Sequence, residues 1–249
     1  MRYFLEFSYN GKAYHGWQNQ PNAITVQEVL EKALCTILKS EISTMGAGRT
    51  DAGVHASQMF AHFDFEENFE PKDLIYKLNS FLPNDIAVTD VFEVKPDAHA
   101  RFDAISRTYH YKISTAKNVF DYDFTYGVPL PLNIVKMNEA CKILFEYKDF
   151  QCFSKSNTDV KTYNCDIKEA FWTEKSNQLI FKITADRFLR NMVRAIVGTI
   201  ISIGLGKLNP EDLHNIIASK DRSEAGFSVP AHGLYLVEIV YPDTIKINE

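Results

Sequence analysis

Apolar and polar positions alternate in several short stretches of the chain, as side chains do on the two faces of a β-strand. This pattern predicts strands over residues 2–9, 57–65, 86–94, 107–115, 164–173, 178–185 and 234–240. Turn-forming residues border two of them, because Asn10-Gly11 follows the first strand and Pro83-Asn84-Asp85 precedes the third.

Apolar positions recur with helical spacing between these strands. Thr25 and Glu28 form a capping box, which predicts a helix from there to about Lys39. Pro71 suits the first turn of a second helix, over residues 72–81. Further helices are predicted over 135–146, 188–203 and 210–219.

The order of these elements predicts an α+β fold with mostly antiparallel sheets. Each half of the chain runs through strand, helix, strands, helix and strand, and we place the boundary so that the halves span residues 1–104 and 105–249. Hydrophobic residues make up 45% and charged residues 24% of the chain, a mixture that suits globular units with a sizeable core.

Charge and hydropathy narrow the class of function. The formal net charge of -5 argues weakly against a nucleic-acid partner, because affinity for phosphate comes largely from Lys and Arg. Clustering of the basic residues on one face matters more than their total. The apolar, uncharged run over residues 195–206 is shorter than the roughly 20 apolar residues of a membrane helix. We see no apolar leader after Met1 and expect a cytoplasmic protein without a membrane span.

The four cysteines, at positions 35, 141, 152 and 165, show no pair at the spacing of a zinc site. Reduced and mostly buried thiols are the expected state. The histidines show no ligand spacing either, and we expect His55 to have a structural role. We therefore predict neither a metal ion nor an organic cofactor.

The least ordinary stretch of the sequence is residues 46–56, in which six of eleven residues are Gly or Ala. Small residues let a backbone approach a ligand closely or adopt unusual dihedral angles. Arg49, Thr50 and Asp51 stand among them, and a carboxylate on such a loop is placed to act as nucleophile or base. The plainer interpretation is a turn in which the aspartate caps a backbone amide.

Arginines are spaced along the predicted helix over 188–203. Arg187, Arg190 and Arg194 stand at i, i+3 and i+7, which would place them on one helix face, and Gly198 would continue that face. No acidic residue interrupts residues 187–203. We expect a cationic stripe opposite an apolar one, although a plain solvated helix face has the same pattern.

The string Gly48-Arg49-Thr50-Asp51-Ala52-Gly53-Val54-His55-Ala56 resembles the active-site motif of the TruA-type pseudouridine synthases. The resemblance extends over nearly the whole chain, in the order expected for that family. It includes the segments at 7–11, 14–20, 99–102, 107–111, 149–153, 187–198 and 233–236. Many members carry a second basic residue where His110 stands, so a backbone contact there would be weaker or pH-dependent.

The resemblance implies a role for each matching residue. Asp51 would be the essential catalytic carboxylate, and Arg49 would enter the RNA and replace a flipped base. Tyr109 would stack on that base, Arg194 would pair with the catalytic aspartate, and Leu234 would line the uracil pocket. We add a set of basic residues as expected RNA contacts: Arg101, Arg107, Arg187 and Arg190.

The resemblance also implies the pseudouridine synthase fold, with two ferredoxin-like α/β halves flanking a central cleft that binds RNA. The N-terminal half would carry the aspartate loop, and the C-terminal half the stacking tyrosine and the arginine helix. The implied substrate is a uridine at position 38, 39 or 40 in the anticodon stem-loop of tRNA, and the implied assembly is a homodimer. The carboxylate is compatible with attack on the sugar, addition to the base or removal of a sugar proton.

Three other functions remain to be compared with this one. The first is an RNA-binding protein of the same fold without catalysis, which would not need a carboxylate beside anionic RNA. The second is a hydrolase that uses Cys152 or Cys165, although no nucleophile motif surrounds either residue. The third is a phosphatase with Asp64 as nucleophile, but a phosphate-cradling loop is missing from the sequence.

Overall fold

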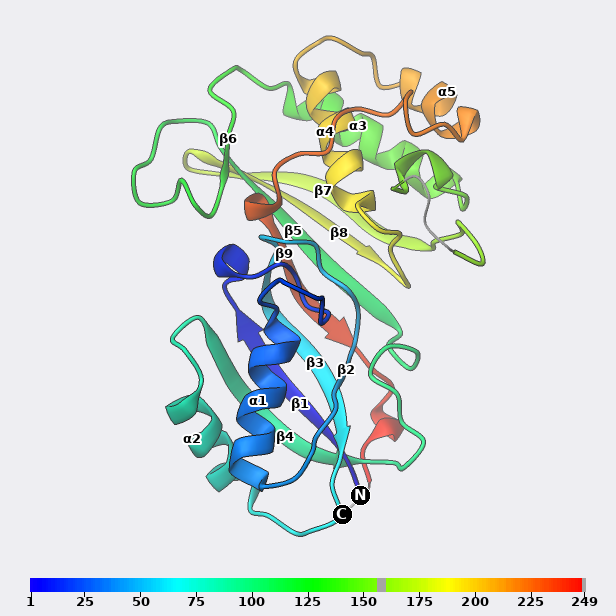
Figure 1. Cartoon of the computed structure of the whole chain (residues 1–249). Helices are drawn as coiled ribbons and strands as arrows, with labels where there is room; N and C mark the ends of the chain where they lie inside the picture. Colours follow the sequence, from blue (N-terminus) through cyan, green and yellow to red (C-terminus); the bar gives the residue numbers. More distant parts are fainter. Residues whose placement is uncertain (156–159, 248–249) are drawn as a thin grey trace. The chain divides into compact units, whose positions relative to one another are not determined.

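A computed structural model describes residues 1–155 and 160–247, and the chain divides into two compact units. The first unit comprises Met1–Ser106 and the stretch from Leu236 onward, and the second comprises Arg107–Tyr235. The C-terminal stretch therefore folds with the N-terminal part of the chain. Figure 1 shows the elements of both units.

The strands and helices of each unit have the following bounds. The first unit contains β1 (Arg2–Tyr9), α1 (Val26–Leu38), β2 (Met45–Gly46), β3 (His55–Asp64), α2 (Pro71–Phe81), β4 (Ile86–Val94) and most of β9 (Leu234–Val240). The second unit contains β5 (Ser106–Ser114), β6 (Tyr126–Gly127), α3 (Ile134–Ile143), β7 (Ile167–Lys175), β8 (Gln178–Ala185), α4 (Met192–Gly204) and α5 (Asp212–Ser219).

In the first unit, β1 lies between two antiparallel partners. Leu5 stands opposite Ala61 of β3 on one side and opposite Val91 of β4 on the other. The strand order is β4-β1-β3-β9, and β2 adds a short pairing to β3. Helix α2 packs on β4 with α1 beside it. The Thr25 hydroxyl accepts a hydrogen bond from the Glu28 amide at 3.3 Å, as the capping box predicts.

The second unit is built on three antiparallel strands in the order β5-β8-β7, with β6 parallel to β5. Tyr109 of β5 faces Ile183 of β8, and Tyr111 faces Phe181. Helix α3 packs against α4 and against β7. The α+β class with mostly antiparallel pairing is thus confirmed. Among the described residues, no helix has both the length and the apolar character needed to cross a membrane.

The predicted strands and helices agree with the structure to within a few residues, apart from one helix. The helix predicted over 188–203 begins only at Met192. Asn191 just before it has a φ of +69°, in the left-handed region, and this interrupts a right-handed helix. Strands β2 and β6 are only two residues long, too short to produce an alternating pattern.

Candidate active site

The glycine-rich loop between β2 and β3 carries Asp51, and its neighbours on both sides are hydrogen-bonded to the N-terminal segment. The hydroxyls of Tyr9 and Thr50 are hydrogen-bonded at 2.9 Å on one side. On the other side, the Gly53 amide donates to the Tyr14 carbonyl at 3.2 Å. The half-buried Asp51 therefore lies between two hydrogen-bonded neighbours, Thr50 and Gly53.

Two glycines of the N-terminal segment allow this close packing. A Cβ at Gly16, whose φ is +87°, would lie 2.2 Å from the Thr50 carbonyl oxygen, and a Cβ at Gly11 would lie 2.0 Å from that of Val54. Both distances are far below a van der Waals contact, so any larger residue would displace the loop. The ring of His55, 2% exposed, accepts a hydrogen bond from the Gly11 amide at 3.1 Å, which fits a structural role.

In the second unit, the predicted stacking residue Tyr109 is supported by an aromatic neighbour. The ring of Phe188 meets the Tyr109 ring edge-on, with 5.1 Å between the centroids and 89° between the planes. Edge-to-face pairs of this kind are favourable beyond the area that they bury. Tyr109 and Tyr111 also lie on the same face of β5, because side chains alternate along a strand.

Arg194 is bound to a segment that precedes β9. Its Nε donates to the Val229 carbonyl at 2.7 Å, and the Val229 amide donates back to the Arg194 carbonyl at 3.2 Å. A few residues later, the buried Leu234 begins β9. Arg194, Leu234 and Tyr109 therefore belong to one unit, while Asp51 belongs to the other.

The expectation of a cationic stripe along one helix face is wrong. Arg187 and Arg190 precede the first residue of α4, so they do not share a helix face with Arg194. Helix α4 is buried nearly all round, and Gly198 faces another part of the chain instead of solvent. A Cβ at Gly198 would lie 1.8 Å from the Phe227 carbonyl oxygen.

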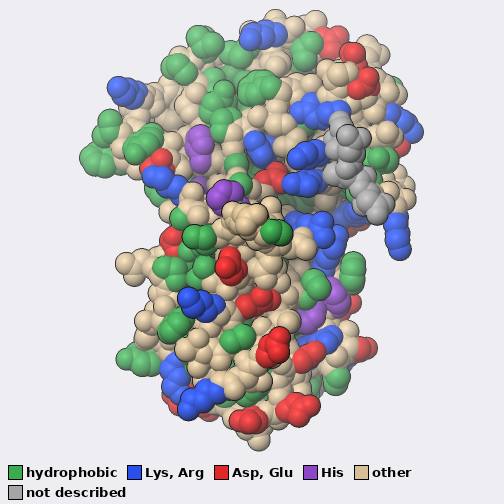
Figure 2. All heavy atoms as spheres, viewed as in Figure 1, with side chains coloured by type: hydrophobic (Ala, Val, Ile, Leu, Met, Phe, Trp, Pro, Cys, Tyr) green, Lys and Arg blue, Asp and Glu red, His purple; other side chains and the backbone are tan. Residues whose placement is uncertain are grey.

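Arg187 closely follows β8, and Arg107 of β5 is bonded to the same turn. The Arg107 guanidinium donates to the Asp186 carbonyl at 2.8 Å, and the Arg187 amide donates to the Asp186 carboxylate at 2.7 Å. The Lys155 amide donates to the Arg190 carbonyl at 3.0 Å, which places a lysine beside Arg190. Figure 2 shows Lys and Arg side chains gathered on this face of the second unit, toward the right. A basic patch thus exists despite the acidic total charge.

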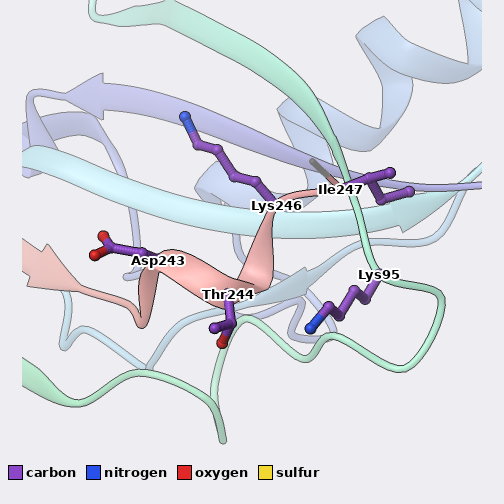
Figure 3. A pocket seen from close by; sticks show the side chains of 5 residues that line it. All are labelled: Lys95, Asp243, Thr244, Lys246 and Ile247. Atoms are coloured by element: carbon purple, nitrogen blue, oxygen red, sulfur yellow. The ribbon is translucent and has the colours of Figure 1, made fainter. Parts of the chain in front are cut away.

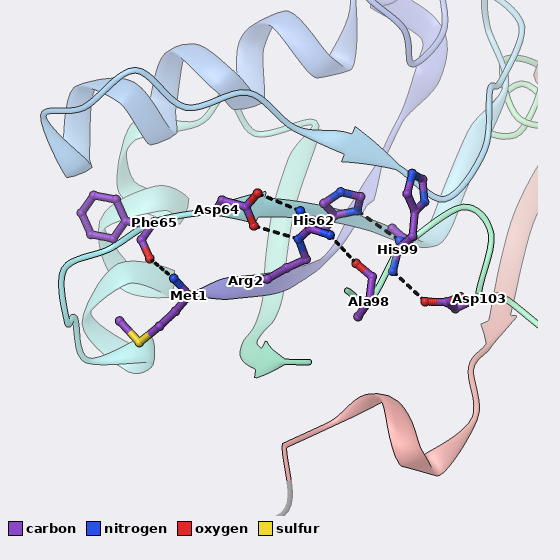
Figure 4. A network of polar contacts seen from close by, with 9 residues as sticks. Met1, Arg2, His62, Asp64, Phe65, Ala98, His99 and Asp103 are labelled. Atoms are coloured by element: carbon purple, nitrogen blue, oxygen red, sulfur yellow. Dashed lines mark hydrogen bonds and ion pairs between the residues drawn. The ribbon is translucent and has the colours of Figure 1, made fainter. Parts of the chain in front are cut away.

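The first unit contributes two exposed arginines, Arg49 on the aspartate loop and Arg101 on a loop after β4. Two histidines hold the second loop (Figure 4). The Ala100 amide donates to His62 Nδ1 at 3.1 Å. The Arg101 amide donates to His99 Nδ1 at 3.1 Å. These bonds need unprotonated Nδ1 atoms, and burial lowers the pKa of both rings.

The three other candidate nucleophiles, Cys152, Cys165 and Asp64, have structural surroundings. Cys152 and Cys165 are buried, and burial raises the pKa of each thiol to about 12, so that almost none is thiolate near neutral pH. Both Asp64 carboxylate oxygens accept hydrogen bonds from the Arg2 guanidinium at 2.8 Å, and this pairing lowers the pKa of Asp64. The structure therefore does not support a cysteine hydrolase or an Asp64 phosphatase.

None of the residues that line a surface pocket of the first unit is a predicted site residue. The pocket is lined by Lys95, Asp243, Thr244, Lys246 and Ile247 (Figure 3). The ammonium group of Lys246 lies 4.4 Å from the centroid of the Phe92 ring, which suits a local cation–π contact. Within residues 1–155 and 160–247, no three His, Cys, Asp or Glu side chains are grouped so as to hold a metal ion.

Comparisons with known proteins point to one family and cover nearly the whole chain. The profile of the family described as tRNA pseudouridine synthase matches residues 7–103 and 140–242. A protein of Parabacteroides distasonis is 52% identical over 247 residues, which cover 98% of this chain and 97% of that protein. A protein of Bacteroides fragilis is 53% identical over 246 residues, 98% of each chain, and one of Bacillus subtilis is 40% identical over 245 residues, 97% of this chain and 99% of that protein. All three are named tRNA pseudouridine synthase A.

These matches define the class of enzyme as an isomerase that converts uridine to pseudouridine. The chain belongs to the tRNA pseudouridine synthase family. The motif around Asp51 and the segments at 99–102 and 187–198 lie within the matched residues.

Sequence reasoning passed over the residues that support the predicted site. Tyr111 and Phe188 fall within the motif segments at 107–111 and 187–198 without a role of their own. In the structure, Tyr111 lies two positions after Tyr109 on the same strand face, and Phe188 touches the Tyr109 ring. The alternation along β5 would have pointed to Tyr111. No local pattern points to the contact between Phe188 and Tyr109, because it joins two separate segments.

Proposed function

We propose that this chain isomerises uridine at positions 38, 39 and 40 in the anticodon stem-loop of tRNA, with Asp51 as the essential carboxylate. The names of the relatives support tRNA as the substrate, and the resemblance of the motifs supports the anticodon stem-loop. The observation that carries the proposal is the anchoring of the loop on both sides of Asp51, where the Thr50 hydroxyl is bonded to that of Tyr9 and the Gly53 amide to the Tyr14 carbonyl. A carboxylate held in this way does not have to be ordered when it meets the substrate.

The target base must leave its stack before it can react, at a cost of a few kcal/mol. Arg49 is exposed on the same loop as Asp51, and its planar guanidinium takes the place of the extruded base. The ring of Tyr109 stacks on the flipped uracil, a contact worth about 1–3 kcal/mol for a nucleobase. The edge of Phe188 keeps that ring in one orientation.

The reaction exchanges one bond of the sugar carbon C1′ for another. The bond from C1′ to N1 breaks, the uracil rotates, and a bond from C1′ to C5 forms. C5 then releases its hydrogen as a proton, and N1 gains one, so that atoms and electrons balance without a cofactor. Arg194 pairs with Asp51 and favours its ionised form, while Leu234 lines the uracil pocket.

The arginines outside the reaction centre bind the RNA backbone. Arg101 of the first unit and Arg107, Arg187 and Arg190 of the second contact phosphate groups of the tRNA, and Lys155 adds to the positive field of the second unit. The first unit supplies the aspartate loop, and the second unit supplies the stacking tyrosine and Arg194. The enzyme acts in the cytoplasm as a homodimer.

The proposal is tested by tritium release from tRNA transcripts labelled at C5 of uridine. The wild-type protein should release tritium, and Asp51→Ala should lower the single-turnover rate by at least about 10³-fold while tRNA binding persists. Asp64→Ala is the matched control, because it removes a carboxylate of the same unit that is paired with Arg2, and it should keep most of the rate. Transcripts with cytidine at positions 38, 39 and 40 should release little tritium.

Two results would contradict the proposal. Equal rates for Asp51→Ala and the wild-type protein would remove Asp51 from the chemistry. Binding of tRNA by the wild-type protein without any tritium release would favour a non-catalytic RNA-binding protein of the same fold.

A further inference from the structure

A second tyrosine of β5 is fully buried and has a contact that the proposed reaction does not use. Tyr111 is 0% exposed, and its hydroxyl donates to the Pro230 carbonyl at 2.8 Å, across 119 positions of sequence. Burial raises the pKa of Tyr111, so the phenol remains protonated and able to donate. A hydrogen bond of this kind is costly to remove, because the carbonyl would lose its partner in a poorly solvated place.

The ring of Tyr111 also touches the backbone of the same segment three residues further on. A Cβ at Gly233 would lie 2.7 Å from Cζ of Tyr111, 3.0 Å from its hydroxyl oxygen and 3.0 Å from the Lys112 carbonyl oxygen. Only a residue without a side chain fits between the ring and the strand. Tyr111 therefore contacts the segment at Pro230 through its hydroxyl and at Gly233 through its ring.

The other end of this segment is bound to α4. Arg194 exchanges two hydrogen bonds with Val229, one through its Nε and one through its carbonyl oxygen. Nearby, Gly198 of α4 lies directly against the Phe227 carbonyl. The segment from Val229 to Gly233 is consequently held between α4 and β5, and Leu234 follows at once.

These contacts link three residues of the proposed site through one side chain. Tyr109 lies two positions before Tyr111 on the same strand face, Leu234 follows the glycine that the Tyr111 ring covers, and Arg194 holds the start of the segment. A shift of the segment relative to β5 would move Leu234 and Arg194 away from Tyr109. Misplacement of about 1 Å is enough to cost up to about 10²-fold in rate.

We propose that Tyr111 is a positioning residue, whose hydroxyl and ring fix the segment from Val229 to Leu234 on β5 so that Leu234 and Arg194 remain aligned with Tyr109. This inference rests on the proposed function of that site. Tyr111 acts through its neighbours and does not touch the uracil.

The test compares Tyr111→Phe with Tyr235→Phe. Both tyrosines are buried, and both donate to a backbone carbonyl at 2.8 Å, that of Phe124 in the case of Tyr235. The two changes remove the same atom and a bond of the same kind. Tyr111→Phe should lower the single-turnover rate of tritium release at saturating tRNA about tenfold or more with tRNA affinity unchanged, whereas Tyr235→Phe should keep the rate within about threefold.

A second variant tests the same contact from the side of the segment, and a second measurement does not depend on activity. Gly233→Ala pushes on the Tyr111 ring, so it should slow the same step, and the double variant should lose less than the product of the two single losses. Amide hydrogen exchange of Ala231–Leu234 should become faster in Tyr111→Phe and remain unchanged in Tyr235→Phe.

Equal rates and equal exchange in Tyr111→Phe and Tyr235→Phe would overturn the inference, and so would a change in tRNA affinity without a change in rate. A failure of the proposed function would be recognised by a different measurement. In that case Asp51→Ala would match the wild-type protein, while the exchange measurement would still report whether Tyr111 holds the segment.

Discussion

Acidification from pH 8 to pH 5 should weaken the first unit through His62. This ring is 8% exposed, and its Nδ1 accepts a hydrogen bond from the Ala100 amide (Figure 4). Burial is the largest cause that lowers the pKa of His62 from 6.5 to about 4, and the charges of Arg2 and His99 lower it further against the opposing effect of two aspartates. The folded state therefore holds this histidine neutral.

Linkage gives the sign and the size of the effect. A histidine whose pKa is lowered by folding contributes its full stability above the unfolded value of 6.5, and the contribution is lost as the pH falls from there through about 4. The free energy of unfolding should fall by up to about 2 kcal/mol between pH 8 and pH 5 for this group alone. His99 adds to the loss in the same window, because burial lowers its pKa as well.

The two tryptophans of the chain allow the first unit to be observed separately, since Trp17 belongs to it and Trp172 to the second unit. Replacing Trp172 by Phe removes the second signal, and among the described residues the Trp172 Nε1 has no hydrogen-bond partner to lose. Urea unfolding followed by Trp17 fluorescence is then measured at pH 8 and pH 5 for this background and for the same background with His62→Asn.

The asparagine oxygen lies near the position of Nδ1 and still accepts from the Ala100 amide, but it does not titrate. Between pH 8 and pH 5, the free energy of unfolding should therefore fall by up to about 2 kcal/mol more in the protein with His62 than in the His62→Asn variant. An equal loss in both proteins would refute the reasoning.

Two further predictions concern the packing of α4 and the separate roles of two arginines at the site. Gly198→Ala should destabilise the second unit by about 3 kcal/mol, because its Cβ would meet a backbone carbonyl oxygen at 1.8 Å. Gly204→Ala in the same helix should change the free energy of unfolding by no more than about 1 kcal/mol, because its Cβ meets the flexible Met137 side chain. Equal changes of this free energy in the two variants, measured by urea unfolding, would contradict the reasoning. Arg194→Ala should mainly slow the single-turnover step, whereas Arg49→Ala should mainly weaken tRNA binding. If Arg194→Ala lost tRNA affinity and Arg49→Ala did not, the two roles would be reversed.

Patterns along the sequence predicted elements well where one face of the element is buried. The capping box at Thr25 and the alternation along β5 both correspond to observed contacts. The helix predicted over 188–203 began too early, because apolar residues suit a buried loop as well as a helix. Leu189 is 4% exposed although it lies outside α4, and the left-handed Asn191 separates it from the helix.

The candidate site was predictable to the extent that its chemistry lies in short motifs. The loop with Arg49 and Asp51 is recognisable by its small residues alone. The contacts that hold Asp51 in place were not predictable, because Tyr9 and Tyr14 reach the loop from a segment about forty positions earlier. The small size of Gly16 has meaning only once that segment lies against Thr50.

By itself, the sequence determined the α+β class, the order of the strands and helices along the chain, and the segments that carry the chemistry. Each of these depends on residues near one another in the chain, through periodicity, capping and motif spacing. Only the tertiary structure decided that Gly198 lies against Phe227 and that Tyr111 holds Pro230 and Gly233. Such contacts join remote segments, and close packing brings them together only when the elements of a unit assemble.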